Sequence, residues 1–323
     1  MTPAEQGQPR RPAEGRPERM ARGGVWGGRP PEASTGLVIV DKPSGWTSHD
    51  VVGRIRRLAG TRRVGHAGTL DPMATGVLVV GVEKATRLLG HLALTEKEYT
   101  GTIRLGQATD TDDADGEIIA ETSAAGVTAA ALRTAAAGLT GEIQQVPPGF
   151  SAIKVAGKRA YRLARDGEAP ELEARAVTVR SLTISAVRPL GDVLDADVAV
   201  TCSSGTYIRA LARDLGAALG VGGHLTALRR TRVGPYELSA ARTLDQLEAS
   251  FGVIPLADAA AAAFPRRDLT GDEARLVAHG RRLPASGAGA ASGPIAAFGP
   301  DGALIALLTE DQGEARPLAV FAP

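Results

Sequence analysis

The spacing of the apolar segments is the feature that most constrains how this chain folds. Alternating or continuous apolar runs predict strands at residues 37–40, 76–82, 99–105, 177–187 and 195–201. Amphipathic or Ala-rich stretches predict a helix that begins at Thr47 or Ser48 and further helices at 128–138 and 206–219. Several neighbouring strands are close enough to pair as hairpins, whereas helices separate others. We therefore expect an α+β fold with a mixed, largely antiparallel central sheet flanked by helices, and not a doubly wound parallel sheet.

Composition divides the chain into three parts. Residues 1–35 hold six of the 20 prolines and six arginines, so we expect a disordered tail that buries little apolar surface. Residues 36–250 carry the strand and helix patterns of one large domain. Residues 256–323 contain two strand-like segments, 295–298 and 304–308, around a turn at 299–302. We expect a small β-rich domain there.

Several classes of protein are excluded or disfavoured by the residues that are scarce. The single cysteine, Cys202, excludes a disulfide framework and a Cys-rich zinc site, and the five histidines form no zinc-binding pair. The acidic run at 110–117 lacks the spacing of an EF-hand, and we interpret it as a turn close to a functional site. No run of 18 apolar residues and no secretory signal are present, so we expect a cytoplasmic protein without a membrane span or a metal.

The near-neutral charge of the chain hides local clusters. Lys and Arg total 37 and Asp and Glu total 36, which gives a formal net charge of +1. Basic residues gather at 54–63, 154–165 and 229–232, whereas acidic residues gather at 110–117 and in the C-terminal part. This separation predicts a positively charged side that could face phosphates.

The segment GHAGTLDPMATG at 65–76 is the densest candidate for chemistry. Asp71 is followed by a proline, which favours an extended backbone at the aspartate, and the segment lies between a predicted helix and a predicted strand. A carboxylate on such a constrained loop suits a nucleophile or a general base. Composition alone leaves a structural turn as the alternative.

Five segments, in order, resemble motifs of the bacterial tRNA pseudouridine-55 synthases, the TruB family of pseudouridine synthases. They are the segments at 41–48, 65–76, 104–116, 147–161 and 202–209, and the resemblance spans about 36–250. It implies the pseudouridine synthase fold for that catalytic domain, an RNA-gripping insertion at 147–175, and a PUA-like C-terminal domain. The C-terminal part has six Arg against eight Asp and Glu, which argues against strong phosphate binding there.

The resemblance implies an isomerisation that breaks the N1–C1′ bond of a uridine, turns the base and rejoins it through C5, with no cofactor. Asp71 matches the family's nucleophile and Arg209 matches the arginine that pairs with it. Tyr99 matches the tyrosine that stacks on the base and is implicated in proton removal. These three residues are the expected catalytic set.

The same resemblance gives the expected substrate-binding residues. His66 matches the histidine that helps to displace the target nucleotide, and Tyr207 and Leu228 match residues that contact the flipped base. The remaining expected contacts are basic: Lys42, Lys154, Lys158, Arg159 and Arg162. We expect helical spacing in the 154–165 segment to spread its cations along one side for the T-arm of tRNA. The implied target is the uridine at position 55 in the TΨC loop, bound by a monomer without an obligatory protein partner.

Two other hypotheses remain open from the sequence. One is the guide-RNA-dependent branch of the same superfamily, which works inside a ribonucleoprotein. The other is a non-catalytic RNA-binding or RNA-folding protein, which would not need Asp71, Tyr99 and Arg209 together. An accessory tRNA-folding role is compatible with the enzyme itself.

Overall fold

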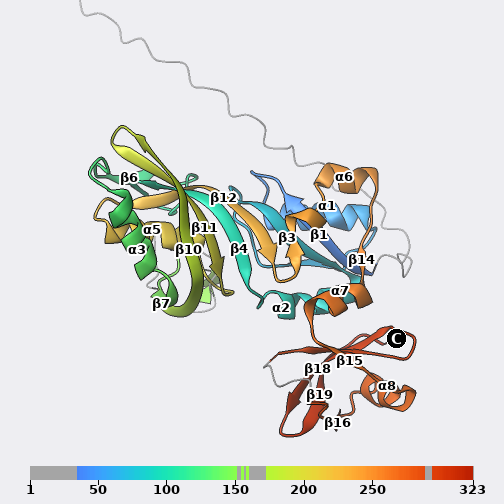
Figure 1. The fold of residues 1–323 in the computed structure, drawn as a ribbon. Coiled ribbons are helices and arrows are strands. Elements are labelled where there is room, and N and C mark those ends of the chain that lie inside the picture. The colour runs from blue at the N-terminus through green and yellow to red at the C-terminus, as the bar shows by residue number, and fades with distance from the viewer. Residues whose placement is uncertain (1–34, 151–153, 156–157, 160–171, 288–292, 323) are drawn as a thin grey trace, which may run out of the picture.

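The computed structural model describes residues 35–150, 154–155, 158–159, 172–287 and 293–322 (Figure 1). Within these residues the larger sheet has ten strands, in the order β14–β1–β3–β12–β4–β11–β10–β7, with β2 beside β3 and β13 beside β12. The strands are β1 (Gly36–Lys42), β2 (Val64–Ala67), β3 (Thr75–Val82), β4 (Lys97–Leu105), β7 (Gly141–Gln145), β10 (Arg175–Leu190), β11 (Val193–Cys202), β12 (Gly223–Val233), β13 (Tyr236–Glu237) and β14 (Ile254–Pro255). Its described strand pairs are antiparallel except for β3 and β12, so the predicted mixed, largely antiparallel sheet is confirmed.

The parallel contact between β3 and β12 joins the two halves of this sheet. It consists of two residue pairs, Arg229 with Thr75 and Arg230 with Gly76. Gly76 has a φ of +97°, and a Cβ there would lie 2.2 Å from the Arg230 carbonyl oxygen. Only glycine therefore permits this close approach without displacement of one strand.

The helices of the described residues lie beside the two larger sheets. They are α1 (Ser48–Leu58), α2 (Leu89–Leu92), α3 (Ala129–Gly138), α5 (Ile208–Ala218), α6 (Leu244–Ala249), α7 (Leu256–Ala263) and α8 (Gly271–Ala278), with 3₁₀ turns η2 (Glu83–Arg87) and η3 (Leu238–Ala240). Helix α1 begins after Thr47, whose side chain accepts a hydrogen bond from the Asp50 N–H while Asp50 caps Thr47 in return. The predicted cap at Thr47 is confirmed.

Strands β1 and β3 are buried on both faces, which explains their continuous apolar sequence. Val38 and Val40 of β1 join one cluster with α1 and α5, whereas Leu37 and Ile39 join a second cluster on the opposite face. The second cluster extends into the C-terminal part through Phe298 and other residues. The large domain and the C-terminal domain therefore share one core.

The C-terminal domain is built on a five-stranded sheet with α8 beside it. Its strands are β15 (Arg266–Asp268), β16 (Leu283–Pro284), β17 (Ile295–Phe298), β18 (Leu304–Asp311) and β19 (Glu314–Val320), in the order β15–β17–β18–β19–β16. The predicted hairpin around 299–302 is confirmed as β17 and β18. Figure 1 shows this domain below the large sheet, connected to it through α7.

Two small ladders lie apart from the main sheets: β5 (Gln107–Thr109) with β6 (Ile118–Glu121), and β8 (Lys154–Val155) with β9 (Lys158–Arg159). The helical expectation for the start of the basic segment is therefore wrong, because Lys154 pairs with Arg159 and Val155 with Lys158 in an antiparallel ladder. Arg162, and the 1–34 part of the predicted tail, lie outside the described residues.

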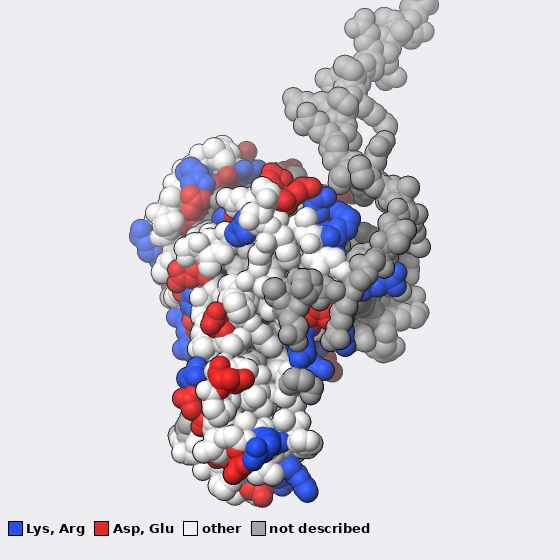
Figure 2. All heavy atoms as spheres, turned by 90° about the vertical axis from the view of Figure 1, so that its right-hand side faces the viewer, with Lys and Arg blue, Asp and Glu red and all other residues white. Residues whose placement is uncertain are grey.

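Within the described ranges, no helix is long and apolar enough to cross a membrane. The face shown in Figure 2 carries positive and negative side chains side by side, and both signs occur over the C-terminal domain at its lower end. This face has no continuous stripe of one sign outside the grey atoms.

Candidate active site

The segment that contains Asp71 is a tightly held connection between β2 and β3. Ser48, at the start of α1, donates from its hydroxyl to the Leu70 carbonyl at 3.1 Å and accepts from the Leu70 N–H at 2.9 Å. The Gly45 N–H donates to the Pro72 carbonyl at 2.9 Å. The residues on both sides of Asp71 are therefore fixed by the β1–α1 connection, far away in sequence.

The first part of the 65–76 segment is a strand and not a loop, which corrects the expectation from the sequence. His66 lies in β2 and pairs with Val80 of β3. Only the residues from Gly68 to Ala74 form the connection, and Gly68 has a φ of +73°. Four residues that include glycine and histidine carry too little periodicity to identify a strand from sequence.

Lys42, the last residue of β1, binds the backbone next to Asp71. Its side chain is fully buried, and its ammonium donates to the carbonyls of Trp46 at 2.6 Å, Pro43 at 3.0 Å and Pro72 at 3.2 Å. Burial lowers the pKa of Lys42 to about 8, although the charge of Asp71 opposes this shift. The geometry favours a role in positioning the Asp71 segment, while contact with substrate stays a prediction.

Asp71 and Arg209 are brought together as the sequence predicted. Nε of Arg209 lies 3.0 Å from Oδ2 of Asp71, and the Arg209 side chain is 5% exposed. The other guanidinium nitrogens of Arg209 donate to the carbonyls of Thr111 at 2.7 Å and Phe150 at 2.9 Å. Arg209 lies in the first turn of α5, where the helix dipole disfavours a cation, so these acceptors hold it in place.

Asp113 is a further site residue that the sequence analysis had placed only in an acidic turn. Its carboxylate lies 3.5 Å from Nε of Arg209 and is almost fully buried. Thr111 and the Asp115 N–H donate to the other carboxylate oxygen. Arg209 is thus shared by two carboxylates, of which Asp71 is the more exposed at 37%.

The pKa of Asp71 reflects opposing effects. Burial raises the pKa of Asp71 and the negative charge of Asp113 adds to this rise, whereas the positive charge of Arg209 lowers it. The net direction is upward. A carboxylate of this kind is more basic than an exposed aspartate, yet stays beside a fixed cation.

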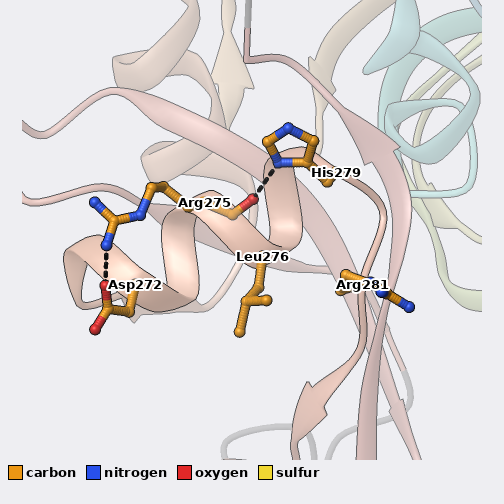
Figure 3. Close-up of a pocket in the computed structure, with 5 residues that line it drawn as sticks. All are labelled: Asp272, Arg275, Leu276, His279 and Arg281. Atoms are coloured by element: carbon orange, nitrogen blue, oxygen red, sulfur yellow. Dashed lines mark hydrogen bonds and ion pairs between the residues drawn. The ribbon is translucent and has the colours of Figure 1, made fainter.

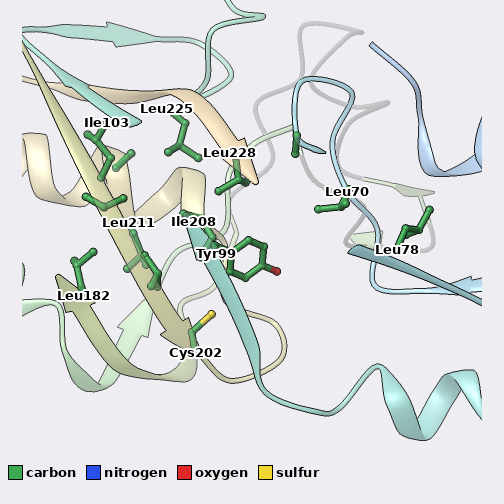
Figure 4. Close-up of a cluster of buried hydrophobic side chains, with 14 of the residues drawn as sticks. Leu70, Leu78, Tyr99, Ile103, Leu182, Cys202, Ile208, Leu211, Leu225 and Leu228 are labelled. Atoms are coloured by element: carbon green, nitrogen blue, oxygen red, sulfur yellow. The ribbon is translucent and has the colours of Figure 1, made fainter. Parts of the chain in front are cut away.

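Tyr99 and Leu228 lie on neighbouring strands of the sheet. Tyr99 of β4 is 7% exposed and Leu228 of β12 is 8% exposed. Figure 4 shows the Tyr99 ring next to Leu228, with its hydroxyl directed toward the side of the cluster that holds Leu70 and Leu78. Burial raises the pKa of the Tyr99 hydroxyl. The two residues provide flat and apolar surfaces beside the Asp71 connection.

Tyr207 and His66 are positioned through different contacts. Tyr207 caps the start of α5, and the side chain of the buried Gln145 binds both its N–H, at 2.8 Å, and its carbonyl, at 3.1 Å. The His66 ring packs edge-on against His49 with centroids 5.6 Å apart, and burial lowers the pKa of His66 to about 4. His66 is therefore neutral at physiological pH.

The predicted basic cluster at 229–232 is not a surface patch. Arg230 is 1% exposed, Arg229 pairs with Asp41 at 2.7 Å, and Arg232 pairs with two glutamates of the β4 region. Alternation along β12 directs Arg230 to the buried side together with Leu228, and neighbouring strands supply the carboxylates. For the 154–165 cluster, the side chains of Lys154, Lys158, Arg159 and Arg162 lie outside the described part, so their contacts stay predictions.

An open pocket of about 610 Å³ lies elsewhere, on α8 of the C-terminal domain. Figure 3 shows its lining: Asp272, Arg275, Leu276, His279 and Arg281. The side chains of this lining are largely exposed, and its polar groups bind one another or the backbone. In the described ranges, no group of three or more His, Cys, Asp or Glu side chains is placed to hold a metal ion.

Three family models match consecutive parts of the chain. The N-terminal domain model of the TruB family pseudouridylate synthases matches residues 56–208, and the tRNA pseudouridylate synthase B C-terminal domain model matches 209–255. The model for the C-terminal part of tRNA pseudouridine synthase II matches 264–322. These matches include Asp71, Tyr99, Arg209 and Leu228.

Curated relatives and solved structures agree with these matches. The chain is 63% identical to tRNA pseudouridine synthase B of Thermobifida fusca over 89% of this chain and 98% of the relative, and 56% identical to that of Mycolicibacterium paratuberculosis over 89% and 98%. Among solved structures, it resembles a chain of an H/ACA RNP bound to a substrate RNA containing 2′-deoxyuridine, with a TM-score of 0.67 and 25% identity over 94% of this chain and 93% of that chain. The chain therefore belongs to the TruB family of tRNA pseudouridine synthases, which are isomerases that act on tRNA.

Proposed function

We propose that the chain converts the uridine at position 55 in the TΨC loop of tRNA to pseudouridine, with Asp71 as the nucleophile and the target base flipped out of the RNA. The observation that carries this proposal is the 3.0 Å ion pair between Asp71 and Arg209 on a connection held from both sides. The position in tRNA rests on the resemblance of the five sequence motifs. A nucleophile must be ionised and fixed, and this arrangement supplies both properties.

The chemistry uses the chain's own side chains. Asp71 attacks C1′ or initiates cleavage of the N1–C1′ bond, while Arg209 keeps its carboxylate ionised. The detached base turns against Tyr99 and Leu228 and rejoins C1′ through C5. Over the whole reaction C5 loses one proton and N1 gains one, so atoms and electrons balance without an oxidant or a reductant. Aromatic and apolar walls offset the stacking that a flipped base loses, about a few kcal/mol.

We further propose that the chain works on tRNA directly and not with a guide RNA. Its curated relatives at 55–63% identity are named tRNA pseudouridine synthase B, whereas the H/ACA structures are 25–26% identical. Turnover of a bare T-arm stem-loop by the purified full chain would support this, and a strict requirement for a second RNA would contradict it.

The test of the nucleophile is Asp71→Asn. We expect the single-turnover rate of pseudouridine formation in a T-arm stem-loop to fall by at least about 10³-fold, because the amide cannot attack C1′. Binding of the stem-loop should change little. The control is Asp272→Asn, which removes an exposed carboxylate on α8 and should leave the rate unchanged.

Two results would contradict the proposal. Near wild-type turnover by a folded Asp71→Asn variant would remove Asp71 as the nucleophile. Mapping of pseudouridine at another position in the stem-loop would remove the assignment to position 55.

A further inference from the structure

Three cations are buried around the Asp71 connection. Lys42, Lys97 and Arg230 are 0%, 6% and 1% exposed. Among the described residues, none of the three forms an ion pair with an Asp or Glu side chain; each donates to backbone carbonyls instead. A buried cation without a carboxylate partner costs folding free energy. Burial lowers the pKa of Lys42 and Lys97 to about 8, so of the three Arg230 is the cation that keeps its charge most firmly.

Arg230 is the most central of these cations because of its place in the sheet. It lies on β12 directly opposite Tyr99 of β4, and on the other side it pairs with Gly76 of β3. Its guanidinium donates to the Val77 carbonyl at 2.7 Å and to the Gly68 carbonyl at 2.9 Å. Because directly opposed residues of paired strands place their side chains on the same face of the sheet, Arg230 lies beside Tyr99. Its positive charge acts to lower the pKa of the Tyr99 hydroxyl, against the effect of burial. One side chain thus lies beside Tyr99 and binds the start of the Asp71 connection.

The neighbouring arginines provide a contrast. Arg229 is paired with Asp41, and Arg232 is paired with Glu96 and Glu98. Their charges are neutralised within the protein. Of these three arginines on β12, Arg230 is the one for which no carboxylate of the described residues forms an ion pair. Its charge can therefore act on negative charge that develops on a neighbouring group during the reaction.

We propose that Arg230 is a positioning residue for the reaction: bound to the start of the Asp71 connection, it holds a fixed positive charge beside Tyr99, and this charge stabilises a Tyr99 phenolate. Tyr99 gives its phenol proton to N1 of the base, and the phenolate then takes the proton from C5. The electrons of the C5–H bond return to the ring, so Tyr99 is restored at the end. A fixed guanidinium in a dry site is effective at this because it needs no reorganisation when charge appears. This inference rests on the role of Tyr99 within the proposed function.

The test uses Arg230→Gln, Arg230→Lys and the control Arg232→Gln on the same strand. We expect Arg230→Gln to lower the single-turnover rate on the stem-loop at neutral pH by about 10²-fold, which is the effect of losing one fixed electrostatic donor. The alkaline limb of the pH–rate profile should move to higher pH, because Tyr99 must start as a phenol and its pKa rises when Arg230 is removed. Arg230→Lys should restore part of the rate, and Arg232→Gln should stay close to wild type.

A spectroscopic measurement separates this role from a purely structural one. The chain has four tyrosines, so the ultraviolet difference between the protein and its Tyr99→Phe variant reports the ionisation of Tyr99. We expect Arg230→Gln to move this ionisation to higher pH. The proposal is overturned if the pH–rate profile and the Tyr99 ionisation profile of Arg230→Gln are both the same as those of the wild type. This holds whether or not the rate itself is lower. If Arg230→Gln does not fold, the pH–rate and ionisation profiles of Arg230→Lys are measured in its place and judged by the same outcomes. Because Asp71→Asn would remain inactive in these cases, failure of this inference is distinguishable from failure of the proposed function.

Discussion

At the scale of single residues, the site depends on groups whose ionisation is set by burial and by few partners. Burial shifts the pKa of three of these groups: it raises the pKa of Asp71 and lowers the pKa values of Lys42 and His66. If Asp71 is the nucleophile, as proposed, it must be ionised, and the upward direction of its pKa then places the acid limb of the activity profile above the ordinary pKa of an aspartate.

His66 makes stability dependent on pH. Its pKa is about 4 in the folded chain and 6.5 for an ordinary histidine, so between these values the unfolded chain binds a proton that the folded chain does not. Folding stability should therefore fall by up to about 3 kcal/mol as pH decreases from 6.5 to 4. His66→Gln should remove this part of the decline in denaturant titrations at several pH values. His279→Gln, at the exposed end of α8, is the control, and an unchanged decline in His66→Gln would contradict the assignment.

The candidate site residues that could be predicted from the sequence are those that stand in a recognisable local motif. Asp71 and Arg209 stand in distinctive motifs, and the structure places them in contact. Arg230 was expected in a basic patch because three arginines in four residues look like a surface charge run. Alternation from Leu228, two positions earlier, is the signal that indicates its burial. The contact of Asp113 with Arg209 depends on tertiary structure, which spacing alone does not give.

At the scale of elements, the strands and helices with strong periodicity were predicted and the short ones were not. Helices α1 and α5 and strands β1, β3 and β4 follow from local patterns of apolar residues. Strand β2 and the β8–β9 ladder have four residues each, and their pairing is decided by neighbours and by a short connection. The order of strands in the sheet depends on long-range pairing, which no local pattern encodes.

Gly76 is the element-scale position most sensitive to change. In Gly76→Ala, an alanine must adopt the left-handed φ of Gly76, and its Cβ would lie 2.2 Å from the Arg230 carbonyl oxygen. Strands β3 and β12 must therefore separate. Gly141→Ala is a matched control, because Gly141 has a φ of +98° and a Cβ there meets nothing within 4 Å. We expect Gly141→Ala to cost about 1–2 kcal/mol of unfolding free energy from backbone strain, and Gly76→Ala to cost a further 1–3 kcal/mol or more. Equal losses for both variants in chemical denaturation would show that the β3–β12 approach is not restrictive.

At the scale of the whole molecule, one apolar cluster joins the large domain to the C-terminal domain, whereas the candidate site residues lie in the large domain. The second apolar cluster links β1 and β3 to the C-terminal sheet, so the C-terminal domain supports the sheet that carries Asp71. The C-terminal domain has a net negative charge, so the expected phosphate-binding regions are the basic segments at 154–165 and 54–63.

The expected role of the 154–165 segment in RNA binding is tested by the salt dependence of the affinity for RNA. Reversing charge with Lys158→Glu and Arg162→Glu should weaken binding of the T-arm stem-loop, because two phosphate contacts are lost. The slope of log affinity against log salt should become shallower by about 1.5 or more, as expected for releasing fewer counterions. An unchanged slope, measured by filter binding at four or more salt concentrations, would remove the segment from the RNA contact.

The two-residue parallel contact between β3 and β12 has a consequence for biosynthesis. Asp71 and Tyr99 leave the ribosome more than one hundred residues before Leu228 and Arg230, yet the proposed site combines residues of both halves. A nascent chain can pair β1 with β3 early, but β12 must be made before it can join β3 to β4. We therefore expect the proposed site to be completed in one late step, because an incompletely translated chain that ends before β12 lacks Leu228 and Arg230.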